Sequence, residues 1–436
     1  MQISKRVVHL TLPDQCEVIY SPDGSSRPFV LSGFALSVFR AIESGADLGN
    51  FDQQKLGVVT KHLQNEGVIS SKTSKNVELP ILSTKVDSNK KIAFWIHTND
   101  MCNLVCSYCY VTKGKRRLDR KTGMGFVDFL VSICKQDRIS QVTLKFAGGE
   151  PLIELALIID MIAYARRNIE PLGTKIHPVI ISNGTLITQD VANIIKANDI
   201  RIAISLDGIG KYNSARRYKD GDSSYRDVVK GIDRLLSVGV KPGIICVISN
   251  ANIAGIPLLI KFASSRKLPI SLSLSREYDP EKGLALDLNL VNTKLLSTLE
   301  WLVGLPDDDL PRFSFNGVSF KGKRTRVCGA GNTYFSIGPK GNIGSCQMTV
   351  DDPFIDSYRN VSSISELSSL CPFENIPSKC QRCVWKYACM GGCEVLRRRT
   401  LSTSRTPIFC KSMKKMLPFL LLLEGRAIQR KKKGVL

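Results

Sequence analysis

The middle of the chain alternates short apolar runs with longer amphipathic segments. The apolar runs predict β-strands because they are short and most end in Gly, Ser, Asn or Asp. There are six such runs between residues 91 and 280: KIAFWIHT, QVTLKFAGG, HPVIISNG, RIAISLDG, KPGIICVIS and LPISLSLS. The segments between them are long enough to be crossover helices, so this region predicts an α/β fold with a parallel sheet. An active site is expected where the carboxyl ends of the strands meet.

The two ends of the chain follow other patterns. Near the N-terminus, VVHLTL and CEVIY alternate apolar and polar residues, which indicates two strands. Amphipathic stretches around residues 34–42 and 56–66, closing on EGVI, extend this prediction to three helices after the strands. The polar segment SSKTSKNVELP is typical of a linker, and beyond about residue 320 periodicity fades while cysteines become frequent.

Length and composition indicate a globular protein of several domains. The chain has 436 residues, about three times a typical domain of roughly 150. Hydrophobic residues make up 43% and charged residues 23%, which is not the composition of a disordered chain. The net charge of +22 favours an acidic partner, whether a peptide, a nucleic acid or an anionic membrane surface.

The positive charge is concentrated at the C-terminus. Residues 380–436 contain fourteen Lys and Arg against Glu394 and Glu424, a net charge of +12. We therefore expect residues 416–436 to form a basic tail whose end, QRKKKGVL, is mobile. The first 90 residues are nearly neutral, with ten basic and nine acidic side chains, which disfavours DNA binding by this region.

No segment of the sequence predicts a membrane span or a secretion signal. The longest apolar run, Met416 to Leu423, is too short to cross a bilayer and contains Pro418. The first twenty residues lack a continuous hydrophobic stretch, so we expect a cytoplasmic protein. Fourteen cysteines in a reducing compartment then indicate metal binding rather than disulfides.

Three cysteines directly after the first predicted barrel strand form a candidate metal site. Cys102, Cys106 and Cys109 are separated by three and two residues. Iron–sulfur and structural zinc sites usually have four protein ligands, so three thiols leave one metal position open. A zinc site would need a fourth ligand, for which His97 is the only nearby histidine.

This spacing resembles the C-x3-C-x2-C motif of the radical S-adenosylmethionine (SAM) superfamily, including the aromatic Tyr108 before the third cysteine. The resemblance implies a partial (β/α)6 TIM-like barrel in which Cys102, Cys106 and Cys109 are catalytic and hold a 4Fe-4S cluster. The fourth iron would chelate SAM, whose reductive cleavage gives a 5′-deoxyadenosyl radical.

Later motifs match the family's order at the ends of the predicted strands. By similarity, Gly148-Gly149-Glu150 binds the SAM amino group, and the motifs after the third and fourth strands reach its ribose and carboxylate. Ile248, after the fifth strand, would lie against the adenine. The implied SAM-binding residues are Tyr108, Gly148, Gly149, Glu150, Ser182, Asn183, Ser205, Asp207, Arg217 and Ile248.

The C-terminal cysteines resemble the seven-cysteine SPASM pattern, which carries two auxiliary iron–sulfur clusters. The pattern implies that Cys380, Cys383, Cys389 and Cys410 bind an outer cluster. Cys328, Cys346 and Cys393 would bind an inner one. The fourth inner ligand stays open: Cys371 could supply it, or could be a spare buried thiol. A zinc ribbon is the alternative for the C-x2-C pairs.

The N-terminal region resembles the winged-helix, PqqD-like peptide-recognition domain fused to many maturases of ribosomally made peptides. In such domains a leader peptide adds a strand to an exposed sheet edge. A structural cap or a DNA-binding winged helix are the alternatives. The expected domains are thus 1–85 for leader recognition, 91–310 for the radical SAM barrel, 320–415 for SPASM and 416–436 for the tail.

Together these resemblances imply a radical SAM peptide maturase with SAM and three 4Fe-4S clusters. Its expected partners are a precursor peptide and an electron donor such as flavodoxin or ferredoxin, without nucleic acid or a membrane span. Side-chain crosslinking is favoured over thioether formation or epimerisation. An anaerobic sulfatase maturase ranks lower, because Gln347 stands where that branch has an aspartate base after the cysteine matching Cys346. Outside the enzymes, a basic metal-binding protein that binds nucleic acid is the alternative.

Overall fold

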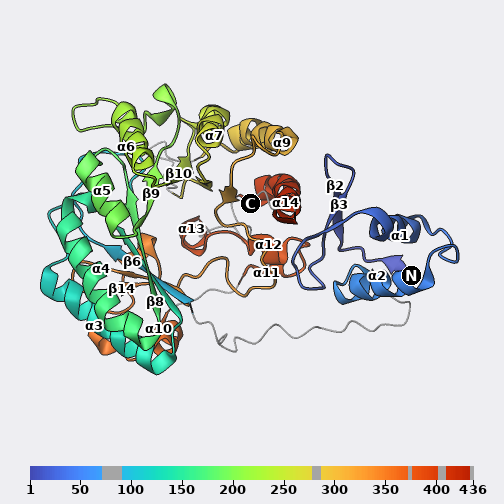
Figure 1. Cartoon of the computed structure of the whole chain (residues 1–436), viewed down its shortest axis with the longest axis horizontal. Helices are drawn as coiled ribbons and strands as arrows, with labels where there is room; N and C mark the ends of the chain where they lie inside the picture. Colours follow the sequence, from blue (N-terminus) through green and yellow to red (C-terminus); the bar gives the residue numbers. More distant parts are fainter. Residues whose placement is uncertain (71–90, 277–285, 372–375, 401–408, 433–436) are drawn as a thin grey trace.

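The computed structural model describes residues 1–70, 91–276, 286–371, 376–400 and 409–432. Figure 1 shows an N-terminal unit at one end of the long axis and an α/β barrel at the other. Helices from the C-terminal part of the chain, among them α11, α12 and α14, lie between these two bodies. The linker predicted at residues 70–80 lies outside the described residues except for Ser70.

A nine-stranded sheet forms the barrel, and its order is β12-β11-β10-β9-β8-β7-β6-β13-β14. All six predicted strands are present, pair in sequence order and are parallel. They are β6 (Lys91–His97), β7 (Gln141–Ala147), β8 (Lys175–Ser182), β9 (Arg201–Ser205), β10 (Gly243–Ile248) and β11 (Ile270–Leu274). The short strand β12 (Phe313–Phe315) continues the parallel pairing beyond β11. The predicted α/β class with a parallel sheet is confirmed.

Helices cover the convex face of this sheet (Figure 1). Alternate strand residues such as Ile92, Phe94 and Ile96 are fully buried against them, whereas the residues between face the concave side. The longer helices are α3 (Arg120–Asp137), α4 (Leu155–Ile169), α5 (Gln189–Ala197), α6 (Tyr225–Ser237), α7 (Ile256–Ser265) and α9 (Leu296–Gly304). Short turns of helix are η1 (Pro151–Glu154), η2 (Glu170–Leu172), η3 (Gly210–Asn213), η4 (Ile253–Gly255), α8 (Leu288–Leu290) and η5 (Val291–Leu295).

The cysteine-rich region adds two strands to the barrel sheet. The sequence did not predict these strands, because the apolar periodicity fades beyond about residue 320. β13 (Tyr334–Ile337) pairs in parallel with β6, and β14 (Ile343–Gly344) pairs with β13 in the opposite direction. The other elements of this region are short: η6 (Gln347–Thr349), η7 (Tyr358–Asn360), α10 (Ile364–Leu370), α11 (Ser378–Gln381), α12 (Lys386–Cys389) and α13 (Glu394–Thr400). The pairing with β6 places this region directly beside the strand that precedes the three-cysteine loop.

The N-terminal unit contains the two predicted strands but only two helices within residues 1–70. β2 (Val8–Thr11), β3 (Glu17–Tyr20) and β4 (Phe29–Leu31) form an antiparallel sheet, and β1 (Gln2–Ile3) pairs with β5 (Ile69–Ser70). The helices are α1 (Gly33–Ser44) and α2 (Gln53–Asn65). The third helix is a wrong prediction, because Gly67 adopts φ +63° just after α2 and the chain turns back into β5.

The expected basic tail is a wrong prediction for residues 416–432, which belong to the helix α14 (Cys410–Lys432). The helix buries Leu417 and Leu421 completely or nearly so. Arg426, counted as part of the basic excess, is buried and donates to Asp307 Oδ1 at 2.5 Å and to the Val303 carbonyl at 2.8 Å. Among the described residues, the structure has no helix both long and apolar enough to cross a membrane.

Helix α14 also holds the N-terminal unit, since it contacts β2, β3 and β4. Gly425 provides the closest approach: a Cβ at this position would lie 2.8 Å from Cβ of Val18. Beside this contact, Tyr20 of β3 stacks on Trp385 at a centroid distance of 5.5 Å. The N-terminal sheet is therefore packed against the cysteine-rich region through a helix and an aromatic pair.

We predict that Gly425→Ala loosens the N-terminal unit. The added methyl group forces Val18 to move, and overpacking of this kind costs about 1–3 kcal/mol. Amide hydrogen exchange of residues 17–20 should accelerate. Gly57→Ala is the matched control, because Gly57 lies in α2 with open space around its Cβ and alanine favours helix by roughly 1 kcal/mol. Unchanged exchange in Gly425→Ala would contradict the proposed packing role.

Candidate functional site

The loop that carries the three cysteines is fixed on one side by the end of β7. The amide of Gly149 donates to the Asn99 carbonyl at 2.6 Å, and the amide of Glu150 donates to the Met101 carbonyl at 2.7 Å. Both positions at the turn need glycine. A Cβ on Gly149 would overlap the Met101 carbonyl, and Gly148 has φ +138° with its Cβ position 2.5 Å from the Asn99 oxygen.

The other side of the same loop is fixed by the segment after η3. The amide of Val105 donates to the Arg217 carbonyl at 2.8 Å, and the amide of Ser107 donates to the Ala215 carbonyl at 3.1 Å. The cysteine loop is thus held between the ends of β7 and of β9. This backbone pairing, together with the fully buried side chain of Leu104, positions the loop.

The three thiols lie in one place at the carboxyl ends of the strands. Burial raises the pKa of the Cys106 thiol, and the neighbouring thiols of Cys109 and Cys102 raise it further while Arg216 lowers it. The side-chain amide of Asn183 points at the Cys102 sulfur at 3.8 Å, and Lys113 Nζ donates to the Cys109 sulfur at 3.4 Å. The structure therefore brings the predicted cysteine set together.

His97 does not join these thiols as a zinc ligand. Its Nε2 lies 2.8 Å from Asp100 Oδ1, and the other oxygen of Asp100 accepts from Arg116 Nε at 2.5 Å. In the described part of the chain, no three His, Cys, Asp or Glu side chains converge as they would around a single metal ion. An iron–sulfur cluster is a better match to three thiols, because each thiolate binds a different iron.

Glu150 lies fully buried at the end of β7 and joins it to the end of β8. Its carboxylate accepts from Ser182 Oγ at 2.8 Å, from the Asn183 amide at 2.8 Å and from the Leu152 amide at 3.1 Å. Burial raises the pKa of this carboxyl, while the three donors lower it. Glu150 therefore orients the Ser182-Asn183 turn, and Asn183 in turn contacts Asn103 of the cysteine loop at 2.9 Å.

Tyr108, Asp207 and Arg216 form a buried network next to Cys106. Asp207 accepts hydrogen bonds from the Tyr108 hydroxyl and, at 3.0 Å, from the Val247 amide. Arg216 donates to the Tyr108 oxygen at 2.7 Å and lies 3.9 Å from Asp207. Burial raises the pKa of Asp207, and the guanidinium of Arg216 opposes that shift. The Nε of Arg216 is buried without a partner among the described residues.

Two of the predicted SAM-binding residues have side chains that point away from this network. Arg217 is exposed, and its Nε donates to the Ser214 carbonyl at 3.2 Å, whereas Arg216 occupies the site. Ile248 is fully buried and alternates with Ile244 and Cys246, so its side chain faces the helices. Ser205 alternates with Ile204 and lies on the concave side, and its contact with SAM stays a prediction. The sequence offered two adjacent arginines, with no signal for which one pointed inward.

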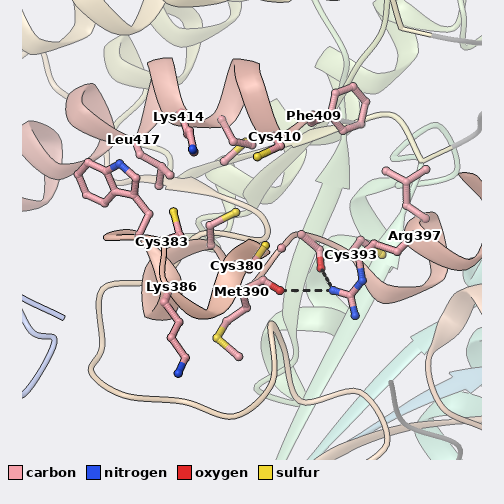
Figure 2. Close-up of a pocket in the computed structure, with 16 residues that line it drawn as sticks. Cys380, Cys383, Lys386, Met390, Cys393, Arg397, Phe409, Cys410, Lys414 and Leu417 are labelled. Atoms are coloured by element: carbon pink, nitrogen blue, oxygen red, sulfur yellow. Dashed lines mark hydrogen bonds between the residues drawn. The ribbon is translucent and has the colours of Figure 1, made fainter. Parts of the chain in front are cut away.

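The C-terminal cysteines fall into two groups. Burial, and after it the thiols of Cys380, Cys383 and Cys410, together raise the pKa of Cys389 to about 11. These four line one pocket with about 600 Å³ of empty space, part of it open to solvent. Figure 2 shows the sulfurs of Cys380, Cys383 and Cys410 turned toward one another, with Arg397 on the far side of Cys393.

The second group consists of Cys328, Cys346 and Cys393. Burial, and after it the thiols of Cys393 and Cys328, together raise the pKa of Cys346 to about 11. Cys371 lies elsewhere, in contact with Gly331 and electrostatically coupled to Arg326. Cys393 also lines the pocket of the first group, so the division of the seven cysteines between an outer and an inner cluster stays a prediction.

Arg324 lies between the two cysteine groups and was missed from the sequence. Its guanidinium donates to the carbonyls of Tyr387 at 2.8 Å, of Val327 at 2.5 Å and of Ala388. Burial lowers its pKa, while the thiols of Cys389 and Cys328, one from each group, raise it. A lone arginine in a basic sequence carries no signal that its partners are backbone carbonyls.

Comparisons with known proteins agree with this geometry. Residues 96–263 match the family model of the radical SAM superfamily. The chain therefore carries a radical SAM domain, and the predicted resemblance to enzymes of this superfamily is confirmed.

Three relatives illustrate the range of sequence similarity. An uncharacterised protein of Methanocaldococcus jannaschii is 33% identical over 168 residues, 38% of this chain, and the chain spans only 56% of that protein's length. Mycofactocin maturase MftC of Mycolicibacterium smegmatis is 26% identical over 309 residues, covering 67% of this chain and 75% of MftC. A cysteine-type anaerobic sulfatase-maturating enzyme of Clostridium novyi is 24% identical over 341 residues, covering 72% and 90%.

Solved structures share the fold over most of the chain. Native anSMEcpe with bound AdoMet superposes with a TM-score of 0.64 at 18% identity, covering 77% of this chain and 99% of that one. Streptococcus suis SuiB bound to precursor peptide SuiA gives a TM-score of 0.54 at 14% identity, covering 93% and 97%. These likenesses establish the radical SAM α/β fold.

We predict that Gly149→Ala disrupts the cysteine loop. The methyl group must displace residues 99–101, so iron bound through Cys102, Cys106 and Cys109 should be lost. Iron analysis of anaerobically reconstituted protein measures this. Gly243→Ala is the matched control, because Gly243 is in barrel strand β10 and its nearest neighbour to a Cβ lies 3.9 Å away. Equal iron content in both variants would refute the steric argument.

We also predict different stabilities for two neighbouring arginine variants. Arg216→Met leaves Asp207 buried without its cation and should cost about 3 kcal/mol of unfolding free energy. Arg217→Met removes an exposed side chain and should change it by less than about 0.5 kcal/mol. Urea unfolding compares the two, and an Arg217 variant as unstable as the Arg216 variant would reverse the assignment.

Proposed function

We propose that this protein is a peptide maturase which uses SAM to abstract hydrogen from a ribosomally synthesised precursor peptide. The observation that carries the proposal is the meeting of four elements at one end of the parallel sheet. These are the three-cysteine loop, the Gly148–Glu150 turn, the Ser182-Asn183 turn and the Tyr108–Asp207–Arg216 network.

The residues present suit a cluster and SAM. Cys102, Cys106 and Cys109 would hold a 4Fe-4S cluster with one iron free of protein ligands. The glycine turn at Gly148-Gly149 keeps the backbone open where a Cβ would clash. When bound, the cluster and SAM supply one-electron cleavage to a 5′-deoxyadenosyl radical, which removes hydrogen from an unactivated carbon.

The protein's own residues orient and shield this chemistry. Arg216 places a positive charge beside Cys106 and favours its thiolate. Its unpartnered Nε is available for an anionic group such as the SAM carboxylate. Asp207, Ser205 and Asn183 would meet the ribose and carboxylate, and Tyr108 is held by Asp207 so that its ring lies at the cluster loop.

The two C-terminal cysteine groups would bind auxiliary clusters in a SPASM domain spanning residues 320–415. Cys380, Cys383, Cys389 and Cys410 would form the outer site, and Cys328, Cys346 and Cys393 the inner site. Each site would accept electrons released when the substrate is oxidised. The electron that cleaves SAM would come from an external donor such as flavodoxin or ferredoxin. Arg324, buried between the groups, would balance the negative charge of both clusters.

The N-terminal unit would be a winged-helix domain that recognises the leader of the precursor peptide. Its three-stranded sheet ends in β2 and β4, and an extended leader could add a strand at one of these edges. SuiB, whose structure with precursor peptide SuiA superposes on 93% of this chain, supports a peptide substrate.

Side-chain crosslinking is the product we favour, with thioether formation and epimerisation as alternatives on the same scaffold. The sulfatase-maturing alternative has similar relatives, but Gln347 cannot serve as a base because a neutral amide does not take up a proton near neutral pH. Gln347 Oε1 accepts from the Tyr334 hydroxyl at 2.6 Å. Nucleic-acid binding is disfavoured because Arg426 and Arg430 of the basic C-terminus are buried against protein carbonyls.

We predict that replacing Cys102, Cys106 and Cys109 together by Ala abolishes reductive cleavage of SAM while the C-terminal metal remains. Anaerobic wild type should contain about twelve iron atoms and the variant about eight, from four-iron clusters. 5′-Deoxyadenosine is measured by chromatography. Cys380→Ala is the companion variant, which should cleave SAM yet lose product formation. SAM cleavage above background in the triple variant would overturn the assignment.

A further inference from the structure

One short segment, residues 387–393, joins the two proposed auxiliary sites. It carries Cys389, assigned to the outer site, and Cys393, assigned to the inner one. Between these cysteines, the three successive residues 390–392 all have positive φ, from 55° to 78°. Met390 is one of them, and a side chain larger than glycine seldom adopts this left-handed conformation. Contacts from elsewhere in the chain must therefore hold the turn.

Arg324 contacts this segment and the inner cysteine group at once. Its Nη1 donates to the Val327 carbonyl at 2.5 Å, and its Nη2 donates to the Ala388 carbonyl. Val327 directly precedes Cys328, and Ala388 directly precedes Cys389. One guanidinium therefore binds the peptide bond next to a cysteine of each group.

Arg397 of α13 makes the equivalent contacts on the other side of the turn (Figure 2). It is 4% exposed, and its Nη1 donates to the carbonyls of Met390 at 3.3 Å and Gly392 at 3.0 Å. Met390 directly follows Cys389, and Gly392 directly precedes Cys393. The second guanidinium thus also binds a peptide bond next to a cysteine of each group, and it closes the left-handed turn.

Neither guanidinium has a carboxylate partner in the part of the chain that the structure describes. Burial lowers the pKa of Arg324, and the thiols of Cys389 and Cys328 oppose that shift. Burial raises the pKa of the Cys380 thiol, and the charge of Arg397 opposes that shift. A buried cation is costly unless anionic groups lie close to it. The thiolates of the two cysteine groups are the anionic groups that these contacts bring near.

We propose that Arg324 and Arg397 are positioning residues which hold segment 387–393 between the two auxiliary sites and raise the reduction potentials of both clusters. The inference rests on the proposed function, since it requires a cluster at each site. Reduction of a cluster adds one electron and one negative charge, while no bond or proton changes. During turnover this electron comes from the substrate radical. A nearby buried cation stabilises the reduced form, because net charge and local hydrogen bonds set cluster potentials.

Glutamine and lysine variants separate the charge of each arginine from its hydrogen bonds, because both side chains donate to carbonyls but only lysine is charged. Full-length, anaerobically cluster-loaded protein is titrated with dithionite at controlled potentials, and the reduced clusters are measured by electron paramagnetic resonance. Signals that do not change when SAM is added belong to the auxiliary clusters. The iron content of each variant is measured on the same samples.

We expect Arg324→Gln and Arg397→Gln each to lower the ratio of reduced to oxidised form about tenfold at a fixed potential. For a one-electron step this is a fall of about 59 mV in the midpoint potential, and it should occur at both auxiliary clusters. Arg324→Lys and Arg397→Lys should keep potentials close to wild type. A purely structural role would not make the potentials follow the charge.

Arg382→Gln is the matched control. It removes the same charge from an exposed position between Cys380 and Cys383, where water and salt screen it, so both potentials should stay at the wild-type values. Unchanged potentials in the glutamine variants of Arg324 and Arg397 overturn the proposal. A fall at only one cluster also overturns it, because each arginine would then serve a single site.

The iron content decides the case in which a variant fails to load. Loss of auxiliary iron from a glutamine variant, with full loading of its lysine counterpart, supports the proposal because the sites then need the charge. Loss from both counterparts refutes it, since the forked shape of the guanidinium and not its charge would be what the sites need.

Formation of 5′-deoxyadenosine from SAM is measured in parallel and separates this inference from the proposed function. SAM cleavage with equal auxiliary potentials in all variants refutes the role of the arginines alone. SAM cleavage by wild type that has no SAM-insensitive signal refutes the auxiliary clusters and this inference with them. Absence of SAM cleavage from cluster-loaded wild type refutes the proposed function itself.

Discussion

The architecture depends on the close backbone contact between residues 99–101 and residues 148–150. Two amides of the second segment donate to two carbonyls of the first, and this pairing fixes the start of the cysteine loop relative to β7. The contact is possible only because two glycines remove the side chains that would stand between the two segments. The same turn positions Glu150, which then orients Ser182 and Asn183. The requirement for glycine at this turn thus brings the ends of β6, β7 and β8 close to the loop that carries the three thiols.

A second set of contacts joins the cysteine-rich region to both neighbours. β13 continues the barrel sheet at β6, so the inner cysteine group is attached to the strand that leads into the three-cysteine loop. α14 starts at Cys410 in the outer pocket and runs to the N-terminal sheet, while Trp385 lines that pocket and stacks on Tyr20. Movement of the N-terminal unit must therefore disturb the wall of the outer pocket. The chain has three regions of different sequence pattern but one continuous set of packed elements.

Features that depend on residues close together in the sequence could be predicted from it. Parallel strands, glycine turns and cysteine spacing are all readable because they depend on residues near one another, and the six barrel strands appear where the apolar runs stand. Side-chain direction at irregular segments was not readable: Arg216 and Arg217 differ only in which faces inward. α14 was mistaken for a tail because its lysines and arginines mask the apolar face of Leu417 and Leu421. β13 was missed because its partner, β6, lies more than 200 residues earlier.

The high positive charge has an internal explanation. Arg216 lies beside Cys106, Arg324 lies between the two C-terminal cysteine groups, and buried Arg397 donates to the Met390 and Gly392 carbonyls that line the outer pocket. The net charge of +22 counts every cysteine as neutral. Under the proposed ligation ten cysteines become thiolates, and thiolate-bound clusters need nearby cations in a low-dielectric interior. Much of the positive excess that the sequence suggests is meant for an acidic partner would then balance negative charge that the protein itself holds.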